Sequence, residues 1–119
     1  MSTPLAPAPI VHFEIGSTDS AHLAAFYGAM LGWTFLPAGA AQVVTSATGP
    51  TGMLNRLGHP PDTYVMLHAQ VDDIDAALAR VVSAGGSKLV GPAPLPDGRK
   101  FAWVRDTAGN VLGLLTPLG

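Results

Sequence analysis

The sequence predicts an α+β fold in which two tandem βαβββ modules form a curved eight-stranded mixed sheet around a cleft, with two helices outside. Strand-like and helix-like patterns occur in the same order twice along the chain. A constant shift that places His12 on Met66 also places Glu14 on His68 and Asp19 on Asp73. The 119 residues fit one domain, 1–119. We divide it into a first module at about 10–57, a linker at 58–62 and a second module at about 63–117.

The first module begins with a strand-like segment at 10–15. His12 and Glu14 alternate there with apolar residues, so both polar side chains should share one face of the strand. Asp19 or Ser20 can then cap a helix that ends at Gly32. Its predicted apolar stripe consists of Leu23, Phe26, Tyr27, Met30 and Leu31. Three strands follow, at 33–36, 42–46 and 52–56, with turns at 38–41 and 48–51.

The second module repeats this order after the linker, which holds a glycine and two prolines. Its first strand, 64–71, is predicted to place Val65, Leu67, Ala69 and Val71 on one face and Met66, His68 and Gln70 on the other. A helix then starts at Asp72 or Asp73 and stops at Gly85-Gly86, with a stripe of Ile74, Ala77, Leu78, Val81 and Val82. Strands at 87–90, 101–105 and 111–116 complete the module.

Composition argues against several classes of partner. The formal net charge is −2 and the six Lys and Arg residues are scattered, so we expect no nucleic acid partner. The dense apolar segment Leu23–Leu36 is shorter than the roughly 20 residues that a membrane span needs. The first nine residues lack the features of a signal peptide, and the chain has no cysteine. We therefore expect a cytoplasmic protein with no membrane partner.

Four sequence motifs occur together in order. They are Val11-His12-Phe13-Glu14-Ile15, then Phe26-Tyr27 with Leu31-Gly32-Trp33, then Val71-Asp72-Asp73-Ile74-Asp75, and Arg105-Asp106-Thr107-Ala108-Gly109-Asn110. Over 10–117 the chain resembles the vicinal oxygen chelate superfamily, which includes glyoxalases, bleomycin resistance proteins and extradiol dioxygenases. The aspartates in these motifs are of the kind that cap helices or shape turns.

The resemblance implies a divalent metal bound by residues on the first and last strands of each half. His12 matches the first ligand position, whereas Met66 and Gly113 stand where two other ligands are expected. Glu14 is the only glutamate, and no acidic residue lies between Asp19 and Asp62, so the last strand of the first half lacks a ligand too. We expect no cofactor. As an alternative, His12, Glu14 and His68 could form a two-histidine, one-carboxylate site for a divalent metal such as Fe(II).

The predicted cleft is lined by polar, sulfur and aromatic side chains. His12, Glu14 and His68 could form a structural hydrogen-bonded cluster, could orient a ligand, or, for Glu14 and His68, could transfer protons. Trp33 and Trp103 could fill the core or stack on an aromatic ligand, and Trp103 is the better candidate for the cleft. The complete set of predicted cleft residues is His12, Glu14, Met53, Met66, His68, Gln70 and Trp103.

Three functions are compatible with these observations. The first is metal-free binding of an apolar or aromatic small molecule, either a metabolite or an antibiotic, as in antibiotic resistance by sequestration. The second is catalysis, either by a glyoxalase-like lyase, isomerase or dioxygenase around His12, or by acid-base chemistry of Glu14 and His68. The third is a regulatory or accessory subunit. The resemblance also implies a homodimer, in which the small residues at Gly39–Ala41 would allow close approach.

Overall fold

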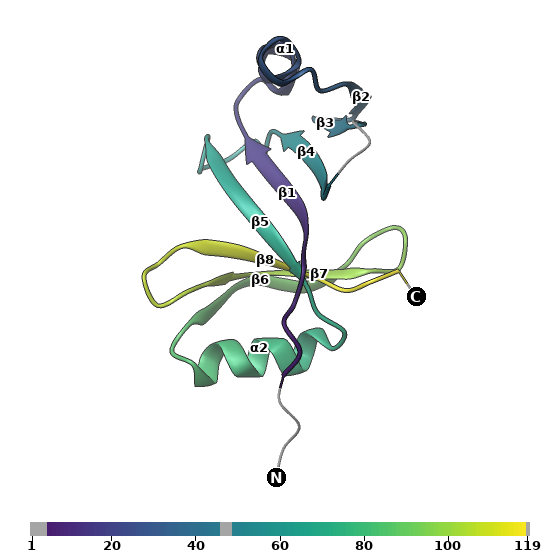
Figure 1. The fold of residues 1–119 in the computed structure, drawn as a ribbon. Coiled ribbons are helices and arrows are strands. Elements are labelled where there is room, and N and C mark those ends of the chain that lie inside the picture. The colour runs from purple at the N-terminus through teal and green to yellow at the C-terminus, as the bar shows by residue number, and fades with distance from the viewer. Residues whose placement is uncertain (1–4, 46–48, 119) are drawn as a thin grey trace. The chain divides into compact units, whose positions relative to one another are not determined.

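The computed structural model describes residues 5–45 and 49–118, which form ten elements in the predicted order (Figure 1). Two of them are helices, each placed after the first strand of a module. The bounds in chain order are β1 Ile10–Gly16, α1 Ser20–Leu31, β2 Phe35–Ala38, β3 Ala41–Val44, β4 Thr51–Asn55, β5 Tyr64–Gln70, α2 Ile74–Ser83, β6 Ser87–Pro94, β7 Lys100–Arg105 and β8 Val111–Leu115.

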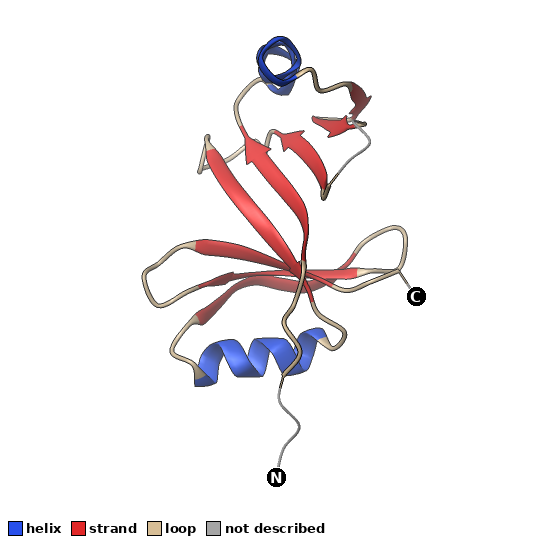
Figure 2. Cartoon of the chain, viewed as in Figure 1, coloured by secondary structure: helices blue, strands red, loops and turns tan. Residues whose placement is uncertain are grey.

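The strands form one eight-stranded mixed sheet in the order β2-β3-β4-β1-β5-β8-β7-β6, which confirms the predicted α+β class (Figure 2). Two of the pairs, β1 with β4 and β5 with β8, are parallel. The β2–β3, β3–β4, β6–β7 and β7–β8 pairs are antiparallel. The curvature of the sheet and its cleft remain predictions.

Contacts divide the chain into two compact units. The first unit is Val11–Leu67, and the second unit is made of the described residues of Met1–Ile10 and His68–Gly119. The division falls inside β5, so the first half of that strand groups with the first unit rather than with the rest of its module.

An aromatic cluster centred on Trp33 fills the first unit beneath α1. The Trp33 ring lies 5.3 Å from that of Phe13 and 5.4 Å from that of Tyr27, on which it stacks. Phe13 pairs with Gly52 across β1 and β4, and its ring covers that glycine, where a side chain would collide with it. Trp33 is therefore partly buried within an aromatic cluster. The helix above is capped by the Asp19 carboxylate, which accepts from the His22 amide at 3.0 Å, and it ends at Gly32 with φ 72°.

The core of the second unit lies between α2 and one face of β5, β7 and β8. Asp73 caps α2 by accepting from the Ala76 amide at 3.0 Å, and Ile74 and Leu78 point from the helix into the core. Burying each of these side chains contributes about 1.5–3 kcal/mol. The buried cluster is Ala69, Ile74, Ala77, Leu78, Ala102, Val104 and Leu114.

Two predicted apolar faces are exposed over part of their length, although Ala69 of the β5 face is buried. In α1, Phe26, Met30 and Leu31 are about half exposed, and no residue of the helix is buried. In β5, Val65 is 71% exposed and Leu67 is also exposed. Of the strands, α1 contacts mainly β3 and β4, and α2 contacts mainly β6 and β7; on this face of β5, Ala69 is the residue buried against α2. Val82 of the α2 stripe is exposed as well.

Several strand bounds also differ from the prediction. The strand expected at 33–36 is β2, which spans Phe35–Ala38. The strand expected at 42–46 is β3, which begins one residue earlier, at Ala41, and Ser46 lies outside the described residues. Strand β6 continues to Pro94 instead of ending at Val90, since its pairing with β7 resumes after register shifts. No helix in the described part of the chain is long and apolar enough to cross a membrane.

Candidate functional site

The first unit contains a buried carboxylate. Glu14 of β1 is only 3% exposed, and its Oε2 accepts a short hydrogen bond from the Tyr64 hydroxyl. The Asn55 amide, from β4, donates to the same oxygen at 3.4 Å. The Glu14 Oε1 makes no hydrogen bond to the described residues. Both donors therefore hold one oxygen of the carboxylate and leave the other for a different partner.

A glycine makes room for the tyrosine that binds Glu14. The Tyr64 ring lies over Gly16, where a Cβ atom would come within 2.6 Å of the ring Cζ. Gly16 follows Glu14 by two residues on the same face of β1, so the ring crosses the strand and its hydroxyl reaches the carboxylate. Burial, followed by the hydrogen bond to Glu14 and the charge of Glu14, raises the pKa of Tyr64 above its ordinary value. Tyr64 thus remains a proton donor to Glu14 across the physiological pH range.

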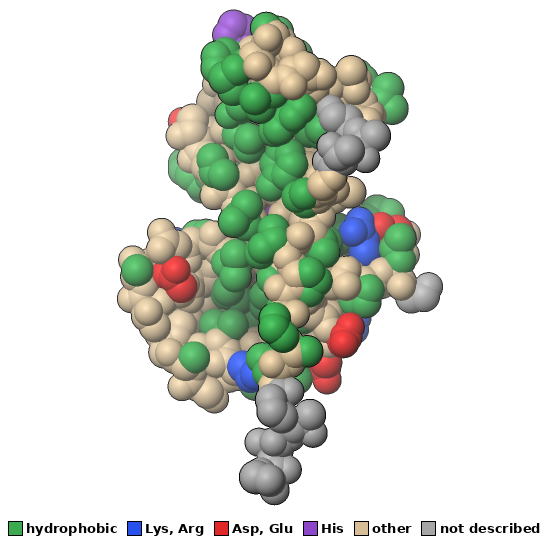
Figure 3. All heavy atoms as spheres, in the orientation of Figure 1, with side chains coloured by type: hydrophobic (Ala, Val, Ile, Leu, Met, Phe, Trp, Pro, Cys, Tyr) green, Lys and Arg blue, Asp and Glu red, His purple; other side chains and the backbone are tan. Residues whose placement is uncertain are grey.

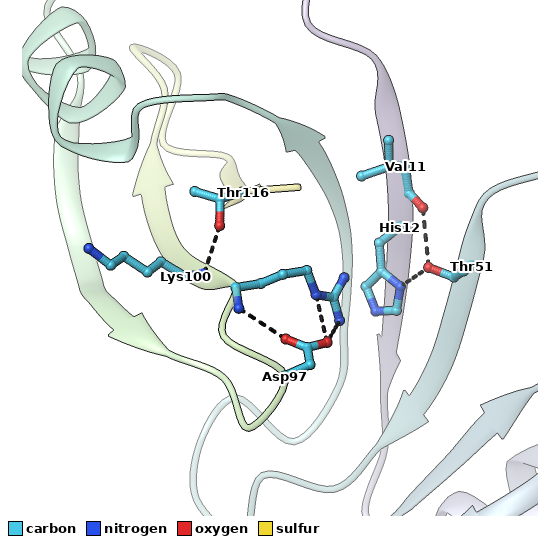
Figure 4. A network of polar contacts seen from close by, with 7 residues as sticks. Val11, His12, Thr51, Asp97, Lys100 and Thr116 are labelled. Atoms are coloured by element: carbon cyan, nitrogen blue, oxygen red, sulfur yellow. Dashed lines mark hydrogen bonds and ion pairs between the residues drawn. The ribbon is translucent and has the colours of Figure 1, made fainter. Parts of the chain in front are cut away.

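His12 is held by Thr51 on the neighbouring strand (Figure 4). The Thr51 hydroxyl donates to the Val11 carbonyl at 3.2 Å, and its oxygen lies 2.6 Å from His12 Nδ1. The Thr51 hydroxyl donates its proton to the carbonyl, so its oxygen can only accept from the imidazole. His12 Nδ1 is therefore the donor in this contact. In the same register Met53 pairs with Glu14, so the predicted residues His12, Glu14 and Met53 occupy adjacent positions on β1 and β4.

The second unit places an imidazole beside an aromatic ring. Gly113 of β8 pairs with His68 of β5 on one side and with Trp103 of β7 on the other. This row lies on the face opposite α2, because the neighbouring residues Ala102 and Leu114 point into the α2 core. The His68 ring covers Gly113, and a Cβ atom there would lie 2.5 Å from Nε2 and 2.6 Å from Cγ.

The remaining predicted site residues differ in burial. His68 is 4% exposed and Met66 is 2% exposed, whereas Gln70 and Trp103 are partly buried. The Trp103 ring lies 6.4 Å from that of Phe101, the next residue along β7 on the same face. The assignment of these side chains to one ligand-binding cleft remains a prediction.

Sequence reasoning missed the partners of the two predicted polar residues, namely Thr51, Asn55 and Tyr64. A signal for Tyr64 was present, because it stands at an even spacing from Met66 and His68 and so belongs to the polar face of β5. The partners on β4 could not be found in this way. They depend on the parallel register of β1 with β4, which no hairpin turn fixes.

Several solved structures resemble this fold. Methylmalonyl-CoA epimerase from Mycobacterium tuberculosis matches with a TM-score of 0.70 and 15% identity, over 98% of this chain and 94% of that chain. A hypothetical protein from Bacillus halodurans C-125 matches with a TM-score of 0.71 and 15% identity, over 94% of this chain and 96% of that chain. A variant of Streptomyces coelicolor methylmalonyl-CoA epimerase in complex with 2-nitronate-propionyl-CoA matches with a TM-score of 0.63 and 16% identity, over 96% of this chain and 100% of that chain.

Residues 12–115 match the family model described as "Glyoxalase-like domain". The chain therefore belongs to the glyoxalase-like domain family, which confirms the predicted membership of the vicinal oxygen chelate superfamily. No curated protein matches the sequence significantly.

The residues present do not fit the metal that the superfamily implies. Gly113 offers no ligand atom, and the His68 ring occupies the space into which a side chain at that position would extend. The sulfur of Met66 is a poor ligand for hard or borderline divalent ions. Among the residues that the structure describes, no three His, Asp or Glu side chains form a group able to hold a metal ion.

Proposed function

We propose that this chain is a metal-independent member of its family that binds an apolar or aromatic small molecule, a metabolite or an antibiotic, in the manner of bleomycin resistance proteins. The observation that carries the proposal is the contact of His68 with Gly113. A glutamate at position 113 would collide with the imidazole. The His68 ring therefore occupies the space in which the last carboxylate ligand of a metal site would lie. We expect the protein to act in the cytoplasm.

The same row of residues favours a flat ligand. Trp103 is partly buried beside Gly113, on the face that α2 leaves uncovered, and Phe101 lies next to it. A partly buried indole offers a stacking surface, and such an aromatic pair contributes about 0.5–1.5 kcal/mol beyond the area it buries. The neighbouring imidazole can orient a polar group of the ligand.

Calorimetric titration with a panel of aromatic metabolites and antibiotics, bleomycin included, tests this proposal in the presence of EDTA. We expect saturable binding by the wild type and about fivefold weaker binding by Trp103→Leu, from the loss of stacking. Trp33→Phe is the matched control, because the Trp33 ring packs against the rings of Phe13 and Tyr27 in the first unit. Near-stoichiometric metal that co-purifies with the wild type and is lost in His12→Ala would contradict the proposal.

Catalysis without a metal is the second candidate, and the geometry of Glu14 favours it. With Tyr64 and Asn55 both on Oε2, Oε1 is left to accept a proton, and the residue is almost fully buried. A carboxylate in such surroundings is suited to abstract a proton next to a carbonyl group. Two of the structural neighbours above are methylmalonyl-CoA epimerases.

Exchange of the α-proton of methylmalonyl-CoA with deuterium, followed by NMR, tests the second candidate. We expect exchange to fall at least about a hundredfold in Glu14→Gln, in line with the effect of removing a general base. Tyr64→Phe should lower it less, because Tyr64 orients Glu14 without receiving the proton. Equal exchange in the wild type and in Glu14→Gln would exclude Glu14 as the base.

A homodimer is part of the proposal. The residues from Ser20 to Asn55 include no Asp, Glu, Lys or Arg, and the first unit exposes apolar side chains over α1, β2 and β3 (Figure 3). An uncharged apolar patch can face its own copy across a twofold axis without opposing like charges. We call the exposed apolar side chains of α1 the α1 patch; it consists of Phe26, Met30 and Leu31.

A further inference from the structure

A hollow of about 280 Å³ lies in the first unit, where the chain leaves β1 and β4. The parallel register of these strands ends at Gly16 and Asn55, and the Ser17 amide then donates to the Asn55 carbonyl at 2.9 Å. This bond keeps the two chain segments together beyond the strands, so Ser17 emerges next to Arg56. The loop that follows, up to Asp62, lines the hollow.

The hollow contains the only cation of its unit. Arg56 is the single Lys or Arg in 11–67, and its exposed side chain forms no hydrogen bond or ion pair with the described residues. The one ion pair within 5–45 and 49–118 joins Arg99 to Asp97, both in the second unit. A guanidinium that is not used for the fold retains its full set of donors, whose planar fork matches a carboxylate or a phosphate.

Hydroxyl groups add further donors beside Arg56. The Ser17 Oγ accepts from the Asp19 amide at 3.2 Å, which leaves the proton of its own hydroxyl for another acceptor. Thr18 lines the same hollow. On the opposite loop His59 Nδ1 donates to the Pro60 carbonyl at 2.9 Å, which holds the imidazole at the wall.

We infer that this hollow binds a small anionic group, a carboxylate or a phosphate. Arg56 is the bidentate donor, and Ser17 and Thr18 supply hydroxyl donors. The volume is near the lower end of the range for ligand pockets, which is of order 300–1,000 Å³, and it suits such a group better than a drug-sized molecule. Asp62 carries the one negative charge among the lining residues and opposes the anion.

The opposing charge gives the proposal a test with a defined sign. Inorganic phosphate and acetate are titrated separately into the full chain at neutral pH and constant ionic strength, and ¹H–¹⁵N NMR follows the backbone amides. We expect saturable shifts confined to 17–18 and 56–62. The anion that binds more tightly shows whether the site prefers a phosphate or a carboxylate. Arg56→Gln should weaken binding at least tenfold, whereas Asp62→Asn should tighten it about twofold to threefold. The matched control is Lys88→Gln, an exposed cation of the second unit, which should leave binding unchanged.

Three outcomes would overturn the inference. The first is shifts that are linear in anion concentration and equal in the wild type and Arg56→Gln, which would show an adventitious ion only. The second is weaker binding in Asp62→Asn. The third is an effect of Lys88→Gln as large as that of Arg56→Gln. Unchanged spectra outside the hollow would show that each variant is folded.

Discussion

Glu14 shows how a single side chain constrains the residues around it. A buried carboxylate must be hydrogen-bonded, and a hydrogen bond to a charged group contributes about 1.5–3 kcal/mol. The bond from Asn55 is long at 3.4 Å, so the Tyr64 hydroxyl is the main donor. Tyr64 in turn reaches Glu14 only because Gly16 lacks a side chain. Glu14 and Gly16 of β1 and the distant Tyr64 of β5 therefore act as one unit, whether the role of Glu14 is structural or chemical.

The raised pKa of Tyr64 predicts a loss of stability in alkali. The Tyr64 hydroxyl holds its proton more tightly in the folded than in the unfolded state, which stabilises the fold. This stabilisation is complete below the unfolded-state pKa of about 10 and is lost as pH rises above it. The free energy of unfolding from urea titrations between about pH 9 and pH 12 should fall more steeply in the wild type than in Tyr64→Phe. Parallel curves would show that Tyr64 ionises equally in both states.

At the scale of the elements, strand β8 has a glycine, Gly113, at the position that the His68 ring of β5 covers. We expect Gly113→Ala to destabilise the protein by about 1–3 kcal/mol, the usual cost of overpacking, because the new methyl group collides with His68. His68→Ala should remove the collision, so that the double variant loses less stability than the sum of the two single ones. Additive losses in thermal or urea unfolding would mean that the two residues do not interact.

The turn between β7 and β8 is organised by Asp106. Its carboxylate accepts from the Asn110 side chain at 3.0 Å and from the Asn110 and Ala108 amides at 2.9 Å, and these bonds lower the pKa of Asp106. A lowered pKa stabilises the turn above the unfolded-state value, and this effect is lost as pH falls through the folded-state value. In a carboxyl ¹³C NMR titration, Asn110→Ala should raise the pKa of Asp106 toward its ordinary value, while the pKa of Asp97 stays unchanged.

Elements whose signals are local could be predicted from the sequence. The helix starts at Asp19 and Asp73 follow from capping by a side chain, and the end of α1 follows from a glycine that can adopt positive φ. The covering of Gly16 by Tyr64 and of Gly113 by His68 could not be predicted. It depends on which residues meet across strands that no short turn connects. The exposure of Val65 shows the same limit, since alternation defines two faces of a strand without indicating which one a helix will cover.

At the scale of the whole molecule, the distribution of charge distinguishes the two units. The first unit contains a single Arg and no Lys, whereas the second contains the other five basic residues. A helix that is apolar on all sides is normally buried, yet α1 has no buried residue in the isolated chain. The α1 patch also lacks the basic residues by which amphipathic helices hold anionic membranes. These observations favour a second copy of the chain as its cover.

The α1 patch predicts that self-association depends on Met30. Burying one methionine side chain contributes about 1.5–3 kcal/mol, and a lysine in its place adds an uncompensated charge near the interface, so Met30→Lys should weaken dimerisation at least about tenfold. Sedimentation equilibrium over a range of protein concentrations would measure the change. Val82→Lys is the matched control, because Val82 is also an exposed apolar residue, on α2 of the second unit. A wild type that is monomeric at all concentrations, or a dimer disrupted only by Val82→Lys, would rule out the α1 patch as the dimer interface. The apolar side chains of α1 would then face solvent in the functional protein.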